Sequence, residues 1–188
     1  VRHGVVDAAI AGGSEAPFSL GFLKAWEAMR IVSPDTCRPF SRDRKGLILG
    51  EGAAMLLMEP LESAQARGAK VWGEIAGFGM SSDAHHLTQP LAEGAARAMR
   101  SALADAAAGP EVIGYINAHG TGTLANDVTE SQAIRDVFGA HADKLAVTAT
   151  KSMHGHALGE AGALEAAATL RSREWGVVTT AAHFTAAR

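Results

Sequence analysis

Short apolar runs alternate with longer helix-forming segments along most of this 188-residue chain. Residues 112–118 and 145–148 have the length and the β-branched content of buried strands. An Ala-rich segment at 93–107 and an amphipathic one at 127–138 are typical of helices. This alternation predicts a layered α/β fold whose strands are largely parallel. The pair Gly12-Gly13 is expected to end the first strand. The same criteria predict further strands at 5–11, 55–59, 71–79 and 177–180, and further helices at 21–30, 61–67 and 158–171.

The composition excludes several classes of protein. Hydrophobic residues make up 47 % of the chain and charged residues 20 %, which is typical of a globular protein and not of a disordered one. The net charge of −3 gives no reason to expect nucleic-acid binding. No apolar run reaches the roughly 18 residues of a membrane span. The single cysteine, Cys37, cannot form an internal disulfide, so we expect a cytoplasmic protein. Because no histidine neighbours Cys37 in the sequence, we interpret it as structural.

The segment Asn117-Ala118-His119-Gly120-Thr121-Gly122-Thr123 lies between a predicted strand and a predicted helix. Ligands of α/β proteins bind beyond the carboxyl ends of strands, where His119 would project into a cleft. The two glycines let a ligand approach the backbone, and Thr121 and Thr123 offer hydroxyl groups. The segment therefore predicts a ligand site, with an ordinary turn and a surface histidine as the alternative.

A second segment, residues 150–159, also follows a predicted strand, and it carries Lys151, His154 and His156. The N–H groups and the dipole of a helix N-terminus favour anions, and a lysine or histidine beside them stabilises developing negative charge. The segment therefore predicts an anion or oxyanion site. One alternative is a zinc site on His154 and His156, for which the chain offers few further ligands. The other is a capped helix with a surface histidine.

Other polar residues are weaker candidates. Glu165 lies in a run of Gly, Ala and Leu, so we expect it to pair with Lys151, to help bind a cation or to face outward. Asp83-Ala84-His85-His86 is more typical of a solvated loop than of a metal site. Asp127 and Glu130 favour the start of a helix through its dipole.

Five ordered motifs of the chain resemble those of the β-ketoacyl-acyl carrier protein synthases of the elongating, condensing type. The segment around His119 is similar to the first active-site histidine motif, and residues 151–156 are similar to the lysine and second-histidine motif. His154 stands where Thr or another residue is common. The other matches are residues 5–16, residues 38–40 with 49–53, and residues 78–86. Such motifs are similar to those of type II ketosynthases of fatty acid, polyketide or nodulation-factor synthesis.

The resemblance implies a thiolase-like fold, in which two similar α/β halves stack as five layers in the order α-β-α-β-α. Residues 1–68 would be the end of the N-terminal half, and residues 69–188 an incomplete C-terminal half. The strand at 5–11 would lie at a homodimer interface. The nucleophilic cysteine of the family would precede residue 1, and its Gly-Phe-Gly-Gly segment has no counterpart. We therefore expect an internal or C-terminal fragment that is inactive alone.

The resemblance also implies a reaction and a partner. In this family malonyl-acyl carrier protein loses carbon dioxide, and the resulting enolate attacks an acyl thioester. The partner is acyl carrier protein with its phosphopantetheine arm, and no cofactor is implied. By position, His119 and His156 match the two histidines that stabilise the enolate, and Lys151 matches the lysine beside them. The hydroxyl groups that hold the pantetheine arm match Thr88, Thr121 and Thr123.

Supporting residues follow from the same resemblance. Glu165 matches the acidic partner of the lysine, and Asp127 is a further supporting residue. Asn117, Ala118 and Glu165 match an alkali-cation site of some members.

Two alternatives come from other classes of protein. A chain-length-factor-like subunit would pair with an active ketosynthase without catalysing the reaction. The presence of His119, Lys151 and His156 argues against this role, because such a subunit needs no decarboxylation residues. A thiolase-like protein that only binds acyl groups is the second alternative.

Overall fold

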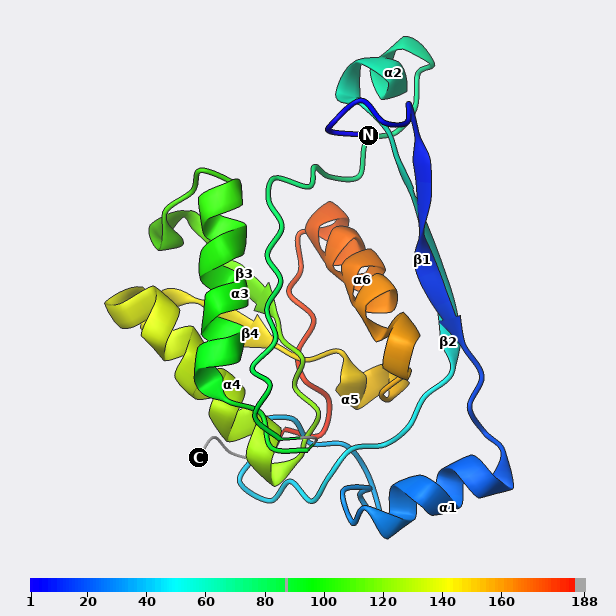
Figure 1. Cartoon of the computed structure of the whole chain (residues 1–188), viewed down its shortest axis with the longest axis vertical. Helices are drawn as coiled ribbons and strands as arrows, with labels where there is room; N and C mark the ends of the chain where they lie inside the picture. The colour runs from blue at the N-terminus through cyan, green and yellow to red at the C-terminus, as the bar shows by residue number, and fades with distance from the viewer. Residues whose placement is uncertain (87, 185–188) are drawn as a thin grey trace.

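Two separate pairs of strands organise the structure, a computed structural model that describes residues 1–86 and 88–184 (Figure 1). Strands β1 (Ala9–Glu15) and β2 (Gly52–Met58) pair antiparallel, whereas β3 (Tyr115–Asn117) and β4 (Ala146–Thr148) pair parallel. The prediction of largely parallel strands is therefore confirmed for the second pair and wrong for the first. The helices are α1 (Leu20–Ala28), α2 (Leu61–Ala66), α3 (Ala92–Asp105), α4 (Leu124–Phe138), α5 (Lys151–His154) and α6 (Ala161–Trp175), with 3-10 turns at Pro110–Val112, Gly139–Lys144 and Leu158–Glu160.

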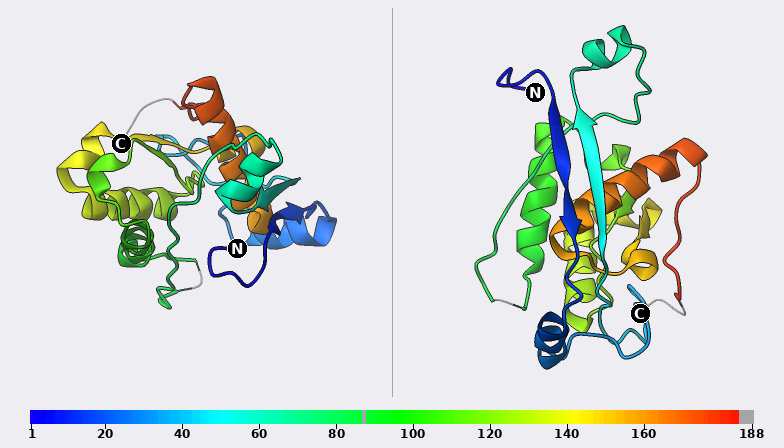
Figure 2. Two further views of the ribbon diagram at one scale, coloured as in Figure 1. Left: turned by 90° about the horizontal axis from the view of Figure 1, so that it is seen from above. Right: turned by 90° about the vertical axis from the view of Figure 1, so that its right-hand side faces the viewer.

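The β1–β2 ribbon covers one side of α6, as the right-hand view in Figure 2 shows. Alternate residues of both strands face inward, and outward residues such as Ile10 and Leu57 are exposed. The predicted strand end at Gly12-Gly13 is wrong, because β1 continues through both glycines. A Cβ at Gly13 would lie only 2.9 Å from the Cα of Glu160. Glycine at this position therefore lets the ribbon pack directly on the turn that precedes α6.

Helices α3 and α4 pack side by side away from this ribbon, next to the β3–β4 pair (Figure 1). Ala96 of α3 and Ala133 of α4 are fully buried, and small side chains of this kind let two helices approach closely. In α4, Ile134 and Phe138 are buried as well. Within residues 1–86 and 88–184, no helix is both long enough and apolar enough to cross a membrane.

Residues 71–79 do not form the predicted strand. Trp72 and Gly73 contact α6, residues 77–79 lie along α3, and no strand pairs with the segment in the part of the chain that the structure describes. A Cβ at Gly77 would overlap the carbonyl oxygen of Ala102, and one at Gly79 would overlap that of Ala98. The glycines therefore let this segment contact the backbone of the helix. Residues 177–180, the other predicted strand, also have no strand neighbour among the described residues.

A segment between α1 and β2 reaches the C-terminal part of the chain. Leu49 and His156 form a parallel bridge. The N–H of Gly50 donates to the carbonyl oxygen of His156 (3.0 Å), and the N–H of His156 donates to that of Ile48 (2.7 Å). These two hydrogen bonds fix the backbone of His156, one of the candidate site residues predicted from the sequence.

We predict that Gly50→Ala destabilises the protein. A Cβ at residue 50 would overlap the carbonyl oxygen of His154, so residues 48–50 would have to move away from His156. The expected loss is about 1–3 kcal/mol of unfolding free energy, measured by urea denaturation. Gly21→Ala is the matched control, because Gly21 lies in α1 with no atom near its Cβ position, and this variant should gain about 0.5–1 kcal/mol. Equal effects of the two substitutions would contradict the prediction.

Candidate active site

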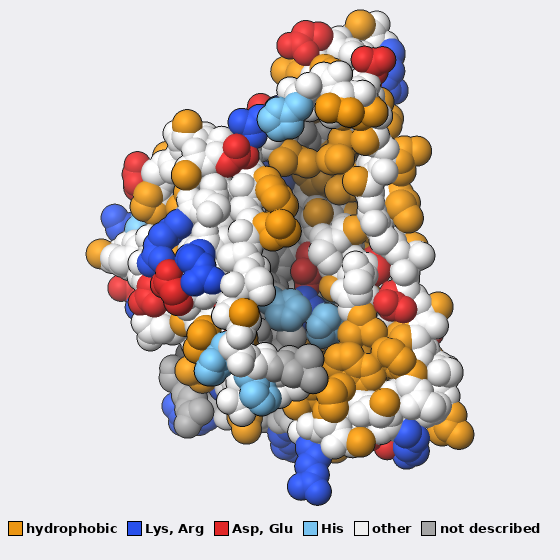
Figure 3. Space-filling view, viewed as in Figure 1, with side chains coloured by type: hydrophobic (Ala, Val, Ile, Leu, Met, Phe, Trp, Pro, Cys, Tyr) orange, Lys and Arg blue, Asp and Glu red, His pale blue; other side chains and the backbone are white. Residues whose placement is uncertain are grey.

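The parallel pairing of β3 and β4 brings two histidines together. His119 follows β3, and His156 follows β4 and the short helix α5. Because the carboxyl ends of parallel strands meet at one edge of a sheet, side chains beyond them converge. The two imidazole rings lie edge to face, with centroids 5.1 Å apart and planes at 86°. Figure 3 shows histidine side chains within a hollow in the middle of this face.

Both imidazoles are neutral at pH 7. The N–H of Leu158 donates to Nδ1 of His156 (3.1 Å), so Nδ1 is an acceptor and the proton lies on Nε2. Burial and the nearby charge of Lys151 lower the pKa of His156 to about 4. The ring of His119 faces an open hollow, yet the surrounding protein removes much of its hydration. This desolvation, with Lys151 and His156 nearby, lowers the pKa of His119 to about 3. Neutral imidazoles donate N–H bonds to developing negative charge without repelling a cation beside them.

A buried ion pair lies next to the histidines. The side chain of Lys151 is fully buried and pairs with Glu165 of α6. Burial raises the pKa of the Glu165 carboxyl, and the contact with Lys151 lowers it in part. A buried ammonium without such a partner would be strongly destabilising. The outward-facing arrangement of Glu165 that the sequence also allowed is therefore absent.

Asn117, at the end of β3, carries the ligand atom that fits the predicted alkali-cation site. Its amide nitrogen donates to the carbonyl oxygen of Glu165 (3.2 Å) and to the hydroxyl of Thr169 (3.1 Å), which fixes the orientation of the amide. Its buried Oδ1 has no hydrogen-bond partner among residues 1–86 and 88–184. Oxygen atoms of this kind are ligands of hard cations. Ala118 is buried beside Asn117, whereas the carboxylate of Glu165 is occupied by Lys151.

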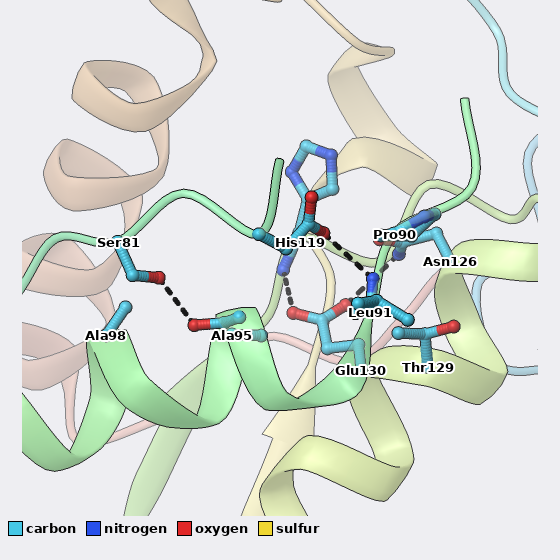
Figure 4. A pocket seen from close by; sticks show the side chains of 11 residues that line it. Ser81, Pro90, Leu91, Ala95, Ala98, His119, Asn126, Thr129 and Glu130 are labelled. Atoms are coloured by element: carbon cyan, nitrogen blue, oxygen red, sulfur yellow. Dashed lines mark hydrogen bonds between the residues drawn. The ribbon is translucent and has the colours of Figure 1, made fainter. Parts of the chain in front are cut away.

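The loop that carries His119 is held by Glu130 of α4. The Glu130 carboxylate accepts the N–H groups of His119 (2.7 Å) and Gly120 (2.8 Å), and Figure 4 shows the His119 ring pointing away from it. From the sequence, Glu130 is expected only to favour the start of a helix through its dipole, so this second role is not among the predictions. Its position in the sequence could have indicated a different role, because Glu130 lies well beyond the Thr123 cap, where the helix dipole has little effect.

Asp127 connects the same loop to a distant segment. It is buried, and its carboxylate accepts the N–H groups of Gly122 (3.1 Å) and Phe40 (2.7 Å). Arg44, also buried, lies 3.6 Å from it. Asp127 thus links residues 40–44 to the start of α4. From the sequence, only a favourable interaction with the helix dipole was expected of it.

The three threonines predicted to hold a pantetheine arm are in two places. Thr121 is buried, and its hydroxyl is hydrogen-bonded to that of Thr123 (2.9 Å), the residue that caps α4. Thr88 lies in the exposed loop before α3, where its N–H donates to Nδ1 of His86 (3.1 Å). Further along, this loop lines a hollow of about 310 Å³ next to His119 (Figure 4).

Cys37 lies behind the loop of His119 and not in the hollow. The Cys37 thiol is buried and donates to the carbonyl oxygen of Thr121 (3.3 Å). Burial raises its pKa to about 11, so the thiol stays protonated at neutral pH. These are the properties of a packing residue, as the sequence predicted.

The zinc alternative finds no ligand set around His154. Its Nε2 lies 3.0 Å from the hydroxyl oxygen of Thr150. In the described ranges 1–86 and 88–184, no three His, Cys, Asp or Glu side chains are arranged to hold a metal ion.

Fold and site together define a thiolase-like α/β protein, and comparisons with solved structures agree. A structure titled "The ishigamide ketosynthase/chain length factor" superposes with a TM-score of 0.92 at 44 % identity, over 99 % of this chain and 45 % of that one. A second, of a type II polyketide synthase acyl-carrier protein in complex with its ketosynthase, gives 0.88 at 37 % identity, over 91 % and 44 %.

This chain belongs to the β-ketoacyl synthase family. The N-terminal domain of that family matches residues 1–64, and the C-terminal domain matches residues 72–185. Nodulation protein E of Rhizobium sp. (strain N33) is 53 % identical over 184 residues, which are 98 % of this chain and 46 % of that protein. The 3-oxoacyl-(acyl-carrier-protein) synthase 2 of Staphylococcus aureus is 46 % identical over 173 residues, 88 % of this chain and 43 % of that protein. The chain thus spans a little less than half the length of these curated relatives.

We predict that Cys37 resists alkylation in the folded protein. With its pKa raised to about 11, the thiolate fraction at pH 8 is very small, so iodoacetamide should react at least about 100-fold more slowly than with free cysteine. Mass spectrometry of the Cys37 peptide, with and without denaturant, measures this difference. Rapid labelling of the folded protein would contradict the structural role.

Proposed function

We propose that these residues form the part of a β-ketoacyl-acyl carrier protein synthase site that decarboxylates malonyl-acyl carrier protein and stabilises the enolate. The observation that carries the proposal is the pair of neutral imidazoles of His119 and His156, 5.1 Å apart beside a buried lysine. The family membership supports the class of reaction, a condensation.

In the proposed step, the bond between the malonyl α-carbon and its carboxylate breaks, and carbon dioxide leaves. The electron pair moves onto the thioester, whose oxygen becomes the enolate oxyanion. N–H groups of His156 and His119 donate to that oxygen. The enolate carbon then attacks an acyl thioester, a carbon–carbon bond forms, and the thiolate of the acyl carrier residue leaves. That residue is a cysteine other than Cys37, whose thiol is buried and protonated.

Lys151 acts through the histidines in this proposal. Desolvation is the larger cause of the lowered pKa of both rings, and the charge of Lys151 lowers it further, which keeps them neutral and able to donate. Glu165 offsets the cost of burying the ammonium. Asp127 is a supporting residue that holds the loop of His119. Asn117 would hold an alkali cation through its free Oδ1, with Ala118 and Glu165 nearby, and such an ion would add positive charge behind the loop.

The partner in this proposal is acyl carrier protein. A neighbouring solved structure contains a ketosynthase with its acyl-carrier protein, which supports that choice. Thr88, Thr121 and Thr123 would contact the phosphopantetheine arm. We further propose that the protein is a cytoplasmic homodimer and that the boundary between its two halves lies between residues 68 and 69. We also propose that these 188 residues alone do not catalyse the condensation.

We predict that His156→Ala and His119→Ala each abolish most malonyl decarboxylation by the full-length protein. Removing one donor to an oxyanion costs about 10²–10³-fold in kcat. Release of labelled carbon dioxide from malonyl-acyl carrier protein measures the effect, and His3→Ala, at an exposed N-terminal position, is the control. Unchanged rates in both site variants would refute the assignment. A wild-type protein that folds but releases no carbon dioxide would favour the chain-length-factor-like alternative.

We predict that the decarboxylation rate is insensitive to histidine protonation from pH 8 down to about pH 5. A lowered pKa leaves the neutral imidazole dominant until the pH approaches about 4 for His156. A histidine with an ordinary pKa of 6.5 would be half protonated at pH 6.5 and almost fully protonated at pH 5. A half-maximal rate near pH 6.5, with the protein still folded by circular dichroism, would contradict the prediction.

A further inference from the structure

Glu160 ends the 3-10 turn Leu158–Glu160 and lies directly before α6, underneath the β1–β2 ribbon. Its side chain is 0 % exposed. The Cα lies 2.9 Å from the Cβ position of Gly13, and both carboxyl oxygens lie 3.6 Å from that of Gly52. Two inward-facing glycines, one on each strand, therefore leave the gap that this side chain fills.

The carboxyl group of Glu160 has no hydrogen-bond partner within residues 1–86 and 88–184. The charged groups that face it from the neighbouring elements are themselves acidic. Glu15 of β1 interacts with it electrostatically, and so does Glu165 of α6, whose own carboxylate pairs with Lys151. Next to β2, Glu51 accepts the N–H of Phe18.

An unpaired ionised carboxylate in such a place is very costly, whereas the neutral acid is much cheaper to bury. Burial and the charge of Glu15 both raise the pKa of Glu160. We propose that Glu160 is a neutral carboxylic acid in the folded protein, and that its ionisation separates the β1–β2 ribbon from α6 as the pH rises.

The sign of the pH dependence follows from linkage. A carboxyl whose pKa is raised on folding contributes stability that is complete below its unfolded pKa, near 4.5, and that is lost as the pH rises toward the folded value. Within that window, each pH unit lowers the folding equilibrium constant by a factor of about ten. The measurement is stability and not activity, so it does not depend on the proposed reaction.

The test compares Glu160→Gln with wild type in the full-length protein, by urea unfolding from pH 5 to pH 9. Glutamine keeps the shape and cannot ionise, so the variant should lose this dependence and become more stable than wild type at pH 8. Glu62→Gln, at an exposed position of α2, is the control and should follow the wild-type profile. Parallel profiles for Glu160→Gln and wild type would overturn the proposal.

Two further measurements remain decisive if Glu160→Gln folds poorly. Glu15→Gln removes the neighbouring charge, so the fall in stability with pH should become smaller than in wild type. The infrared spectrum of the wild-type protein at pH 7 should contain the carbonyl stretch of a protonated carboxylic acid. Its absence, or an unchanged fall in Glu15→Gln, would show that Glu160 is not the group responsible.

Discussion

The backbone pairing of Leu49 with His156 is the constraint on which the rest of this structure depends. Residues 48–50 form a strand-like edge for the turn between α5 and α6 and hold His156 by both its N–H and its carbonyl group. The chain then enters β2 directly, so the same segment also sets where the ribbon meets α6. The position of an imidazole and the packing of the ribbon are therefore consequences of one contact between distant parts of the chain.

A single buried cation sets the electrostatics of the site. Lys151 has no exposed surface, and its only direct charge partner in the described residues is Glu165. Desolvation by the surrounding protein lowers the pKa of both histidines most, and the field of Lys151, which disfavours a second positive charge, lowers it further. A pair of imidazolium rings 5.1 Å apart beside an ammonium would repel one another, whereas neutral rings pack edge to face at that distance.

The sequence predicted features that depend on neighbouring residues along the chain. It did not predict features that depend on contacts between distant segments. The turns after β3 and β4 are local strand–turn–helix patterns, so the places of His119 and Lys151 followed from spacing alone. The course of β1 through Gly12-Gly13 could not be predicted from spacing. A glycine pair often marks the end of a strand, but here Gly13 lets the turn at Glu160 approach the strand closely. The link from Glu130 to the His119 backbone likewise needs α4 to fold back on the loop.

The histidine pair and the carboxyl group of Glu160 act on opposite sides of the neutral pH range. On the acid side, the site keeps its neutral imidazoles because desolvation and then the charge of Lys151 oppose protonation. On the alkaline side, the proposed ionisation of Glu160 limits the pH range in which the β1–β2 ribbon stays packed on α6. Leu158 belongs to the same turn as Glu160, and its N–H donates to Nδ1 of His156. Loosening this turn would therefore also remove the hydrogen bond that fixes the tautomer of the imidazole. The 3-10 turn Leu158–Glu160 thus contacts both the ribbon and the imidazole of His156.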